Sequence, residues 1–444
     1  MKIITILATA GLIALLGFGT FYFRDNSGPT VKLSRGPGAI SARADLGLDL
    51  QDSGTGLKQL TVQAIQGAKT IELVAKQYPK GSHQTHESIK LAAPGGLQEG
   101  PFKLRISARD RAPRDFGRGN NTEMSLDFIF QNRPPQVAIL STAHNVSRGG
   151  AGLVVYTCNV EPEKNGVVIG DRFYPGFRQS GDVYACLFPF PYDMPENTFV
   201  PKVLVVDRAG NDKLTGIYYH TIAKAFPSDR IGLNDAYLQK VFDGFKNRYP
   251  AAKTPLEVFL MANRELRDHD VKSLLETARK SAPLPLWEGG FLRQPNSAPR
   301  GSFAQLRSYV YQGKEVDRQT HLGIDLASLA HAPVLAANNG KVVYADDLGI
   351  YGQCVIVDHG LGLQTLYGHL SRIGVKVGDE VKKGQSVGNS GDTGMAGGDH
   401  LHFGVVVGGE QVNPIEWWDT AWLRNNITGK FQLIHQAARP AQHS

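Results

Sequence analysis

The chain has 444 residues, of which 41% are hydrophobic and 20% charged, a balance that excludes a mainly disordered or fibrous protein. At about 150 residues per domain, this length predicts about three domains. Its 50 glycines favour a turn-rich, largely β protein, and its three cysteines are too few for a disulfide scaffold or a four-cysteine zinc module. The net charge of +7 by itself would allow a nucleic acid or an anionic surface as partner.

The N-terminus, residues 1–25, predicts export from the cytoplasm. Residues Ile3 to Phe23 carry no charge and would form a helix about 31 Å long, close to the ~30 Å core of a bilayer. A cleaved signal peptide is the alternative to a single-pass anchor in the inner membrane. The run ends in aromatic rather than small residues, which favours the anchor. Either interpretation places residues 26–444 in the periplasm or extracellular space and argues against a nucleic-acid partner.

Two blocks of short strands follow, over residues 30–134 and 135–225. Each contains a strand that ends in a similar turn, Ser107–Ala112 in the first block and Val205–Asn211 in the second. We expect two accessory β-sandwiches that resemble immunoglobulin-like modules. Cys158 and Cys186 lie in two strand-like runs of the second block, where they could form a disulfide or remain buried free thiols.

The pattern then changes to helical over residues 228–283. Helical periodicity is found at Ala236–Phe245, Pro255–Leu266 and Val271–Ala278, with Asp235 and Thr254 as expected N-caps. We expect this segment to link the sandwiches to a β-rich C-terminal domain, residues 284–430, which is followed by a tail at 431–444. The predicted fold class is therefore mainly β with a short helical segment.

Four histidines and one aspartate of the C-terminal domain form the candidate site. On a strand, His400 and His402 would point to the same side, because alternate residues share a face. Two such imidazoles suit zinc, and a third histidine and a carboxylate, His321 and Asp325, could complete an open, catalytic type of site. The spacing alone does not show that these residues converge.

Residues 300–418 resemble the zinc endopeptidases of the lysostaphin/LytM type, which cut peptide cross-links in bacterial cell walls. The resemblance is carried, in order, by Thr320–Ala327, Asn339–Val343, Val357–Gly360, Thr365–Leu370, Val377–Gln385 and Gly388–Phe403. It implies a β-rich peptidase fold, with His321, Asp325 and His402 as ligands of Zn²⁺. It also implies that His369 and His400 are catalytic imidazoles, without settling which one is the base.

The remaining histidines have simpler interpretations. His359 lies within the family pattern but is interpreted as structural, and His331 as a surface-loop residue. Five tyrosines are candidates to line the groove, although core or surface packing is an equal alternative for each: Tyr309, Tyr311, Tyr344, Tyr351 and Tyr367.

The predicted function is that of a membrane-anchored zinc endopeptidase acting on the peptide cross-links of peptidoglycan. The alternative is a non-catalytic LytM-like module that binds the cell wall or activates another hydrolase. Envelope regulatory proteins are further possible partners. The sequence leaves open whether a D-Ala–meso-diaminopimelate cross-link or a glycine bridge is cut, and whether the accessory segments position the enzyme or occlude its groove.

Overall fold

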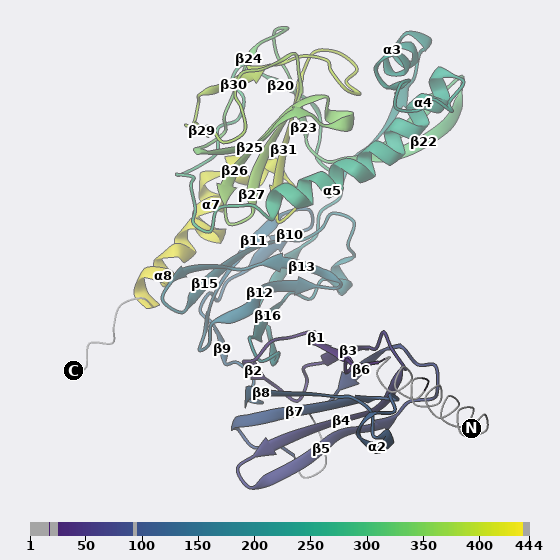
Figure 1. The fold of residues 1–444 in the computed structure, drawn as a ribbon. Helices are drawn as coiled ribbons and strands as arrows, with labels where there is room; N and C mark the ends of the chain where they lie inside the picture. Colours follow the sequence, from purple (N-terminus) through teal and green to yellow (C-terminus); the bar gives the residue numbers. More distant parts are fainter. Residues whose placement is uncertain (1–16, 18–24, 92–95, 438–444) are drawn as a thin grey trace, which may run out of the picture. The chain divides into compact units, whose positions relative to one another are not determined.

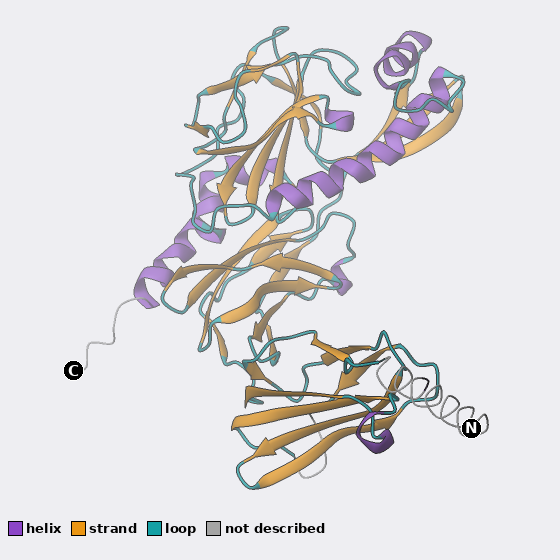
Figure 2. Cartoon of the chain, viewed as in Figure 1, coloured by secondary structure: helices purple, strands orange, loops and turns teal. Residues whose placement is uncertain are grey.

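The computed structural model describes residues 17, 25–91 and 96–437 and is mainly β, as predicted (Figures 1 and 2). It divides into two compact units, residues 1–135 with 206–212, and residues 136–205 with 213–444. Apart from Gly17, the predicted membrane helix Ile3–Phe23 lies outside the described residues. Within the described ranges, no helix combines the length and the apolar character needed to cross a membrane.

The first unit contains two sheets that share one apolar core. Alternate residues of its central strand, β7 (Gly100–Asp110), are buried, including Phe102, Leu104 and Ile106, as expected for a strand with one face toward the core. One sheet has the order β1 (Thr30–Leu33), β3 (Leu46–Gln51) and β6 (Gln84–Ile89). The other has the order β2 (Ala39–Ile40), β8 (Asn121–Phe130), β7 (Gly100–Asp110), β4 (Leu57–Gln66) and β5 (Lys69–Gln77), and a short helix, α2 (Arg114–Gly117), follows β7.

The two similar turns predicted from the sequence are closed by aspartate side chains. Asp110 Oδ1 accepts hydrogen bonds from the backbone N–H groups of Ala112 and Asn120, at 2.9 and 2.7 Å. Asp207 Oδ1 accepts one from the N–H of Asn211 at 2.8 Å. Both carboxylates thus satisfy backbone groups that have no strand partner, which is the usual role of aspartate in turns.

The second unit begins with two four-stranded sheets around a shared core (Figure 1). Their orders are β14 (Phe177–Ser180), β15 (Val183–Pro189), β11 (Ala151–Cys158), β9 (Val137–Ile139) and β13 (Arg172–Pro175), β12 (Pro162–Ile169), β16 (Lys202–Asp207), β17 (Asp212–Gly216). A short parallel pair, β10 (Asn145–Ser147) and β18 (His220–Ile222), and the turn η1 (Glu196–Thr198) accompany them.

Strands β11 and β15 are buried on both faces. Val154 and Tyr156 pack into the core between the two sheets, whereas Leu153 and Val155 pack into the core of the C-terminal domain. This explains why β11 reads as a continuous apolar run rather than as an alternating one. Cys158, Cys186 and Cys354 are buried and form no disulfide, so the disulfide alternative for the first two is not realised.

The helical segment packs directly on the C-terminal domain. Its elements are β19 (Ser228–Gly232), α3 (Asp235–Phe245), α4 (Pro255–Met261), the π-helical turn η2 (Ala262–Leu266) and α5 (Arg267–Ala278). The N-cap of α3 is Asn234, one residue before the predicted Asp235, because the Asn234 side chain accepts the N–H of Tyr237. Thr254 caps α4 as predicted, in a reciprocal capping box with Glu257.

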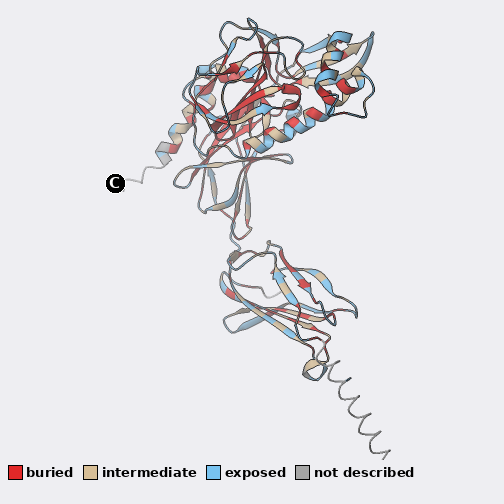
Figure 3. Ribbon diagram, turned by 45° about the horizontal axis from the view of Figure 1, so that its top comes forward, coloured by how far each residue is buried: buried red, intermediate tan, exposed pale blue. Residues whose placement is uncertain are grey.

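The C-terminal domain is built on an eight-stranded sheet, the buried centre of which is visible in Figure 3. The order is β20 (Ala298–Gly301), β23 (Ile324–Ala327), β31 (Leu401–Val407), β27 (Leu363–Leu370), β26 (Gln353–Gly360), β25 (Gly340–Asp347), β29 (Glu380–Val381), with β32 (Glu410–Val412) beside β31. Two three-stranded sheets flank it: β19, β21 (Gln305–Tyr311), β22 (Lys314–His321), and β24 (Pro333–Leu335), β30 (Ser386–Asn389), β28 (Arg372–Ile373).

Short helices complete the domain and extend into the predicted tail. One short turn, η3 (Gly349–Tyr351), lies between β25 and β26. The C-terminal part contains α6 (Pro414–Trp418), α7 (Thr420–Asn426), the turn η4 (Thr428–Lys430) and α8 (Phe431–Ala437). Ile434 of α8 is buried in the same core as Trp417 of α6. The first residues of the expected tail therefore contribute to packing.

Candidate metal centre and active site

Strand register brings the predicted ligands together. Asp325 on β23 lies directly opposite His402 on β31, and Gly368 on β27 lies opposite the same histidine from the other side. His321 is the last residue of β22, and only Leu322 and Gly323 separate it from β23. A Cβ atom on Gly323 would lie 2.4 Å from His402 Nε2, so the glycine allows the imidazole to lie against the backbone.

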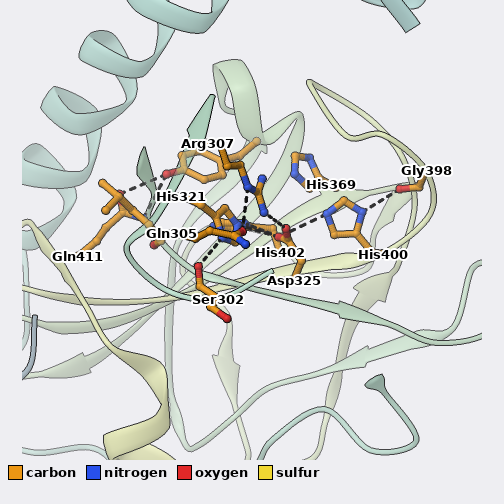
Figure 4. Close-up of polar contacts among 12 residues, drawn as sticks. Ser302, Gln305, Arg307, His321, Asp325, His369, Gly398, His400, His402 and Gln411 are labelled. Carbon is orange, nitrogen blue, oxygen red and sulfur yellow. Dashed lines mark hydrogen bonds and ion pairs between the residues drawn. The ribbon is translucent and has the colours of Figure 1, made fainter. Parts of the chain in front are cut away.

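Three side-chain atoms, which we call the donor set, face one point (Figure 4): His321 Nε2, Asp325 Oδ1 and His402 Nδ1. His321 Nε2 lies 2.9 Å from Asp325 Oδ1, His402 Nδ1 lies 3.0 Å from the same oxygen, and the two nitrogens are 3.0 Å apart. Tetrahedral zinc with bonds of about 2.0–2.1 Å needs ligand atoms roughly 3.3 Å apart. Two imidazole nitrogens and one carboxylate oxygen in this arrangement therefore fit zinc in both donor chemistry and spacing.

The protonation states of these residues also suit metal binding. The N–H at His321 Nδ1 donates to the carbonyl of Ser302 at 2.9 Å, which leaves Nε2 free of a proton in the neutral ring. Burial lowers the pKa of His321 and of His402, the latter to about 4. Burial raises the pKa of Asp325, but the neighbouring imidazoles outweigh this and hold it well below its usual range.

Arg307 and Gln411 hold the site from outside the donor set. Arg307 Nη2 donates to Asp325 Oδ2 at 2.7 Å, so Oδ1 is the oxygen left facing the imidazoles. Gln411 Nε2 donates to the carbonyl of Leu322 at 2.7 Å and thereby supports the connection between His321 and Asp325. Such outer contacts orient metal-binding side chains.

His369 and His400 lie beside the donor set. Their ring centroids are 4.8 Å apart, and each ring donates its Nδ1–H to a backbone carbonyl, Thr393 at 2.9 Å and Gly398 at 2.8 Å. Each Nε2 is therefore the proton-accepting nitrogen of the neutral ring. His400 Nε2 lies 3.4 Å from Asp325 Oδ1. His369 has a φ of +62°, a backbone conformation that is uncommon outside glycine and that often occurs at functional sites.

The environments of these two imidazoles differ. Burial and the nearby imidazoles lower the pKa of His369 well below its usual value. Burial also acts to lower the pKa of His400, but the Asp325 carboxylate, 3.4 Å away, favours the protonated ring and raises the pKa overall. Two imidazoles with such different pKa values can share the tasks of accepting a proton and carrying positive charge.

All five predicted site residues line one cavity of about 380 Å³. Of the five candidate tyrosines, Tyr309 and Tyr351 line it, whereas Tyr367 is a core residue that accepts the N–H of Ala337. Tyr311 and Tyr344 do not line it and donate to Asp235 and to the carbonyl of Asp347. His359 is fully buried between Asn339 and Thr365, and His331 is exposed.

The cavity has a wall that sequence reasoning missed. Residues Ile231–Asn234, Tyr237 of α3 and Arg267 of α5 line it together with Arg307. Helix α3 is attached to the opposite rim by Tyr237 Oη, which donates to the Met395 carbonyl at 2.9 Å. No spacing motif links these residues to the histidines. For Arg307 alone a signal existed, because Gln305, Arg307 and Tyr309 alternate on one strand beside His321.

Comparisons with known proteins match the part of the chain that contains this site. Residues 319–414 match the model of peptidase family M23. The chain is 40% identical over 96 residues to the peptidoglycan DD-endopeptidase ShyA of Vibrio cholerae, covering 22% of each chain. It is 38% identical over 95 residues to the DD-carboxypeptidase/endopeptidase Mpg of Neisseria meningitidis, covering 21% of this chain and 22% of that protein. The chain thus spans about a fifth of the length of these curated relatives.

A solved structure, the catalytic domain of the antimicrobial peptidase lysostaphin from Staphylococcus simulans, is 30% identical to this chain. The likeness covers 28% of this chain and 92% of that domain, with a TM-score of 0.24. The match of residues 319–414 includes every residue of the predicted donor set and both neighbouring imidazoles. Residues 319–414 are therefore a domain of peptidase family M23, of the lysostaphin/LytM type.

Proposed function

We propose that this protein is a zinc endopeptidase that hydrolyses peptide cross-links of bacterial peptidoglycan. The observation that carries the proposal is the convergence of His321 Nε2, Asp325 Oδ1 and His402 Nδ1 within about 3 Å of one another, beside two further imidazoles in one cavity. The peptidoglycan endopeptidases among the relatives support the choice of substrate.

In this proposal, His321, Asp325 and His402 would hold a zinc ion, which would supply Lewis-acid chemistry toward water and a peptide carbonyl. His369 and His400 present Nε2 to the same space, because backbone carbonyls hold their Nδ1–H groups. One imidazole accepts a proton as water attacks the carbonyl carbon. A proton returned by an imidazole then allows the amine to leave as the C–N bond breaks.

The rest of the chain is proposed to place this domain in the cell envelope. The uncharged run Ile3–Phe23 supports export, with retention as an inner-membrane anchor. Residues 30–134 and 135–225 are proposed as accessory, immunoglobulin-like sandwiches, since each of these blocks contains two sheets around one core. Residues 228–283 would then be the helical segment before the peptidase domain, 284–430.

The proposal is tested with purified sacculi. The zinc-loaded protein should release soluble fragments, and a chelator or His369→Ala should abolish the release. His220→Ala is the matched control, because His220 is exposed on β18 and lies outside the cavity. Sacculi that stay intact with the zinc-loaded wild type would contradict the proposed enzymatic activity. That result would favour a module that only binds the wall or activates another hydrolase.

A further inference from the structure

The cavity contains one arginine whose charge the site does not use. Arg267 is the first residue of α5 and follows the π-helical turn η2, within the long helical run that Figure 1 labels α4 and α5. It lines the cavity together with the donor set, yet it lies outside the segment that matches the peptidase family. π-helical turns often occur at functional positions.

Arg267 is held at one end only. Its Nε donates to Asn263 Oδ1 at 3.0 Å, and Asn263, which is fully buried, in turn donates from Nδ2 to Asp317 Oδ2 at 2.9 Å. The two terminal nitrogens of Arg267 make no hydrogen bond or ion pair with any residue of the described ranges. The planar fork of the guanidinium is therefore positioned by its base and remains available.

Among the described residues, neither of the two carboxylates closest to this charge forms an ion pair with Arg267. Asp325 is engaged by Arg307 through Oδ2 and faces the imidazoles through Oδ1. Asp270 lies one turn along α5, but its Oδ2 accepts the N–H of Ile350 at 3.0 Å, and burial raises its pKa to about 7. With two guanidiniums and one ionised carboxylate in a half-enclosed space, the cavity favours an anionic guest, and a guanidinium fork suits a carboxylate best.

We propose that Arg267 is a specificity-determining residue that binds a carboxylate of the peptide substrate. This role rests on the proposed function, and it selects between the two kinds of cross-link that the sequence leaves open. A cross-link with free carboxylates near the cut bond is preferred over a neutral glycine bridge or an amidated stem. Arg307 already donates from Nε to Gln305 and from Nη2 to Asp325, so it is the less available of the two arginines.

The test measures binding separately from cleavage. The full chain carrying His369→Ala is titrated calorimetrically with a cross-linked peptide dimer that has free carboxylates, and with the same dimer after conversion of its carboxylates to carboxamides. The carboxylate form should bind about 10–100-fold more tightly, in line with hydrogen bonds to a charged group. Adding Arg267→Gln should remove this preference, and adding Arg267→Lys should leave only part of it, because lysine lacks the fork.

Lys272→Gln is the matched control, since it removes one positive charge from the exposed face of the same helix. An unchanged preference with Arg267→Gln, or equal losses with both Gln variants, would overturn the proposal. If Arg267→Gln does not fold, an Arg267→Lys variant with the full wild-type preference overturns it as well. A carboxylate preference in binding without any cleavage by the wild type would contradict the proposed function but support this role of Arg267.

Discussion

At the scale of single residues, the site depends on which nitrogen of each imidazole holds its proton. The carbonyls of Ser302, Thr393 and Gly398 each accept an Nδ1–H, from His321, His369 and His400. His402 is the exception, because its Nδ1 faces the donor set while its Nε2 is buried without a hydrogen-bond partner among the described residues. The backbone thus selects the nitrogen that each ring presents to the cavity.

Replacing Asp325 by alanine should remove the metal. The variant loses the carboxylate that joins the two ligand imidazoles, and Arg307 loses its ion pair beside them. We expect zinc affinity to fall by more than about 100-fold, since even the loss of an outer partner costs 10–100-fold. Elemental analysis after dialysis should find about one zinc per wild-type chain and almost none in the variant. Equal zinc contents would place the metal elsewhere.

Glu416 should make the stability of the second unit depend on pH. Its carboxyl is buried, Oε2 accepts the N–H of Ala151 at 3.1 Å, and burial raises its pKa from 4.5 to about 7. Between these two pH values the folded state holds a proton that the unfolded state has lost, so stability should fall as pH rises through this window and level off above it. The full loss is on the order of 3 kcal/mol.

Glu416→Gln removes this ionisation and should be more stable than the wild type at pH 8 but not at pH 4. Urea unfolding at both pH values measures the difference in unfolding free energy between the variant and the wild type. The other titrating groups are present in both proteins, so their contributions cancel in this difference. A stability difference between variant and wild type that does not change with pH would show that the carboxyl of Glu416 ionises equally in both states.

At the scale of elements, the helical run α4–α5 matters because it carries one wall of the cavity. Thr254 begins it, and the Thr254 hydroxyl accepts the N–H of Glu257 at 3.2 Å while the Glu257 carboxylate accepts the N–H of Thr254 at 3.2 Å. Thr254→Ala should lower the free energy of unfolding by about 1 kcal/mol, whereas Thr254→Ser keeps the hydroxyl and should be nearly neutral. Urea unfolding measures the free energy of unfolding of both variants. Equal losses in the Ala and Ser variants would mean that the hydroxyl cap does not contribute to stability.

The sequence predicted the elements that depend on local patterns and missed those that depend on distant partners. The alternation of side chains around His402 was sufficient to predict a strand there, and the capping signal at Thr254 was sufficient to predict the start of a helix. By contrast, β19 is polar and short, and it becomes a strand only because it pairs in parallel with β21. Arg267 could not be found at all, since its place in the cavity follows from how a whole helix packs on a remote sheet.

At the scale of the whole molecule, the peptidase sheet does not have a core of its own. Leu153 and Val155 of β11 and Ala185 of β15 are buried in the same cluster as Leu363 and Val405 of the eight-stranded sheet. On its other face, α3, α4 and α5 share a second cluster with Cys354 and Leu366. The boundary predicted at residue 284 therefore runs through packed apolar surface within the second unit.

Truncation should reveal this shared core. A chain of residues 136–444 should unfold cooperatively on heating and retain zinc. A chain of residues 284–430 should aggregate or unfold without a cooperative transition, because it exposes the faces that residues 151–187 and 231–278 cover. Calorimetry measures the unfolding transition of each of the two chains, and elemental analysis measures the zinc that each retains. Cooperative unfolding of residues 284–430, with one bound zinc, would show that the accessory segments are not needed for folding.

The central claim is that the site of His321, Asp325 and His402 cleaves peptide bonds in the cell wall. Mass spectrometry of sacculus fragments after digestion tests it most directly, with and without a chelator. We predict fragments that differ from untreated cross-linked muropeptides by one added water across an amide bond, and no such fragments with the chelator. Intact cross-links in both samples, or cleavage only of glycosidic bonds, would contradict the account.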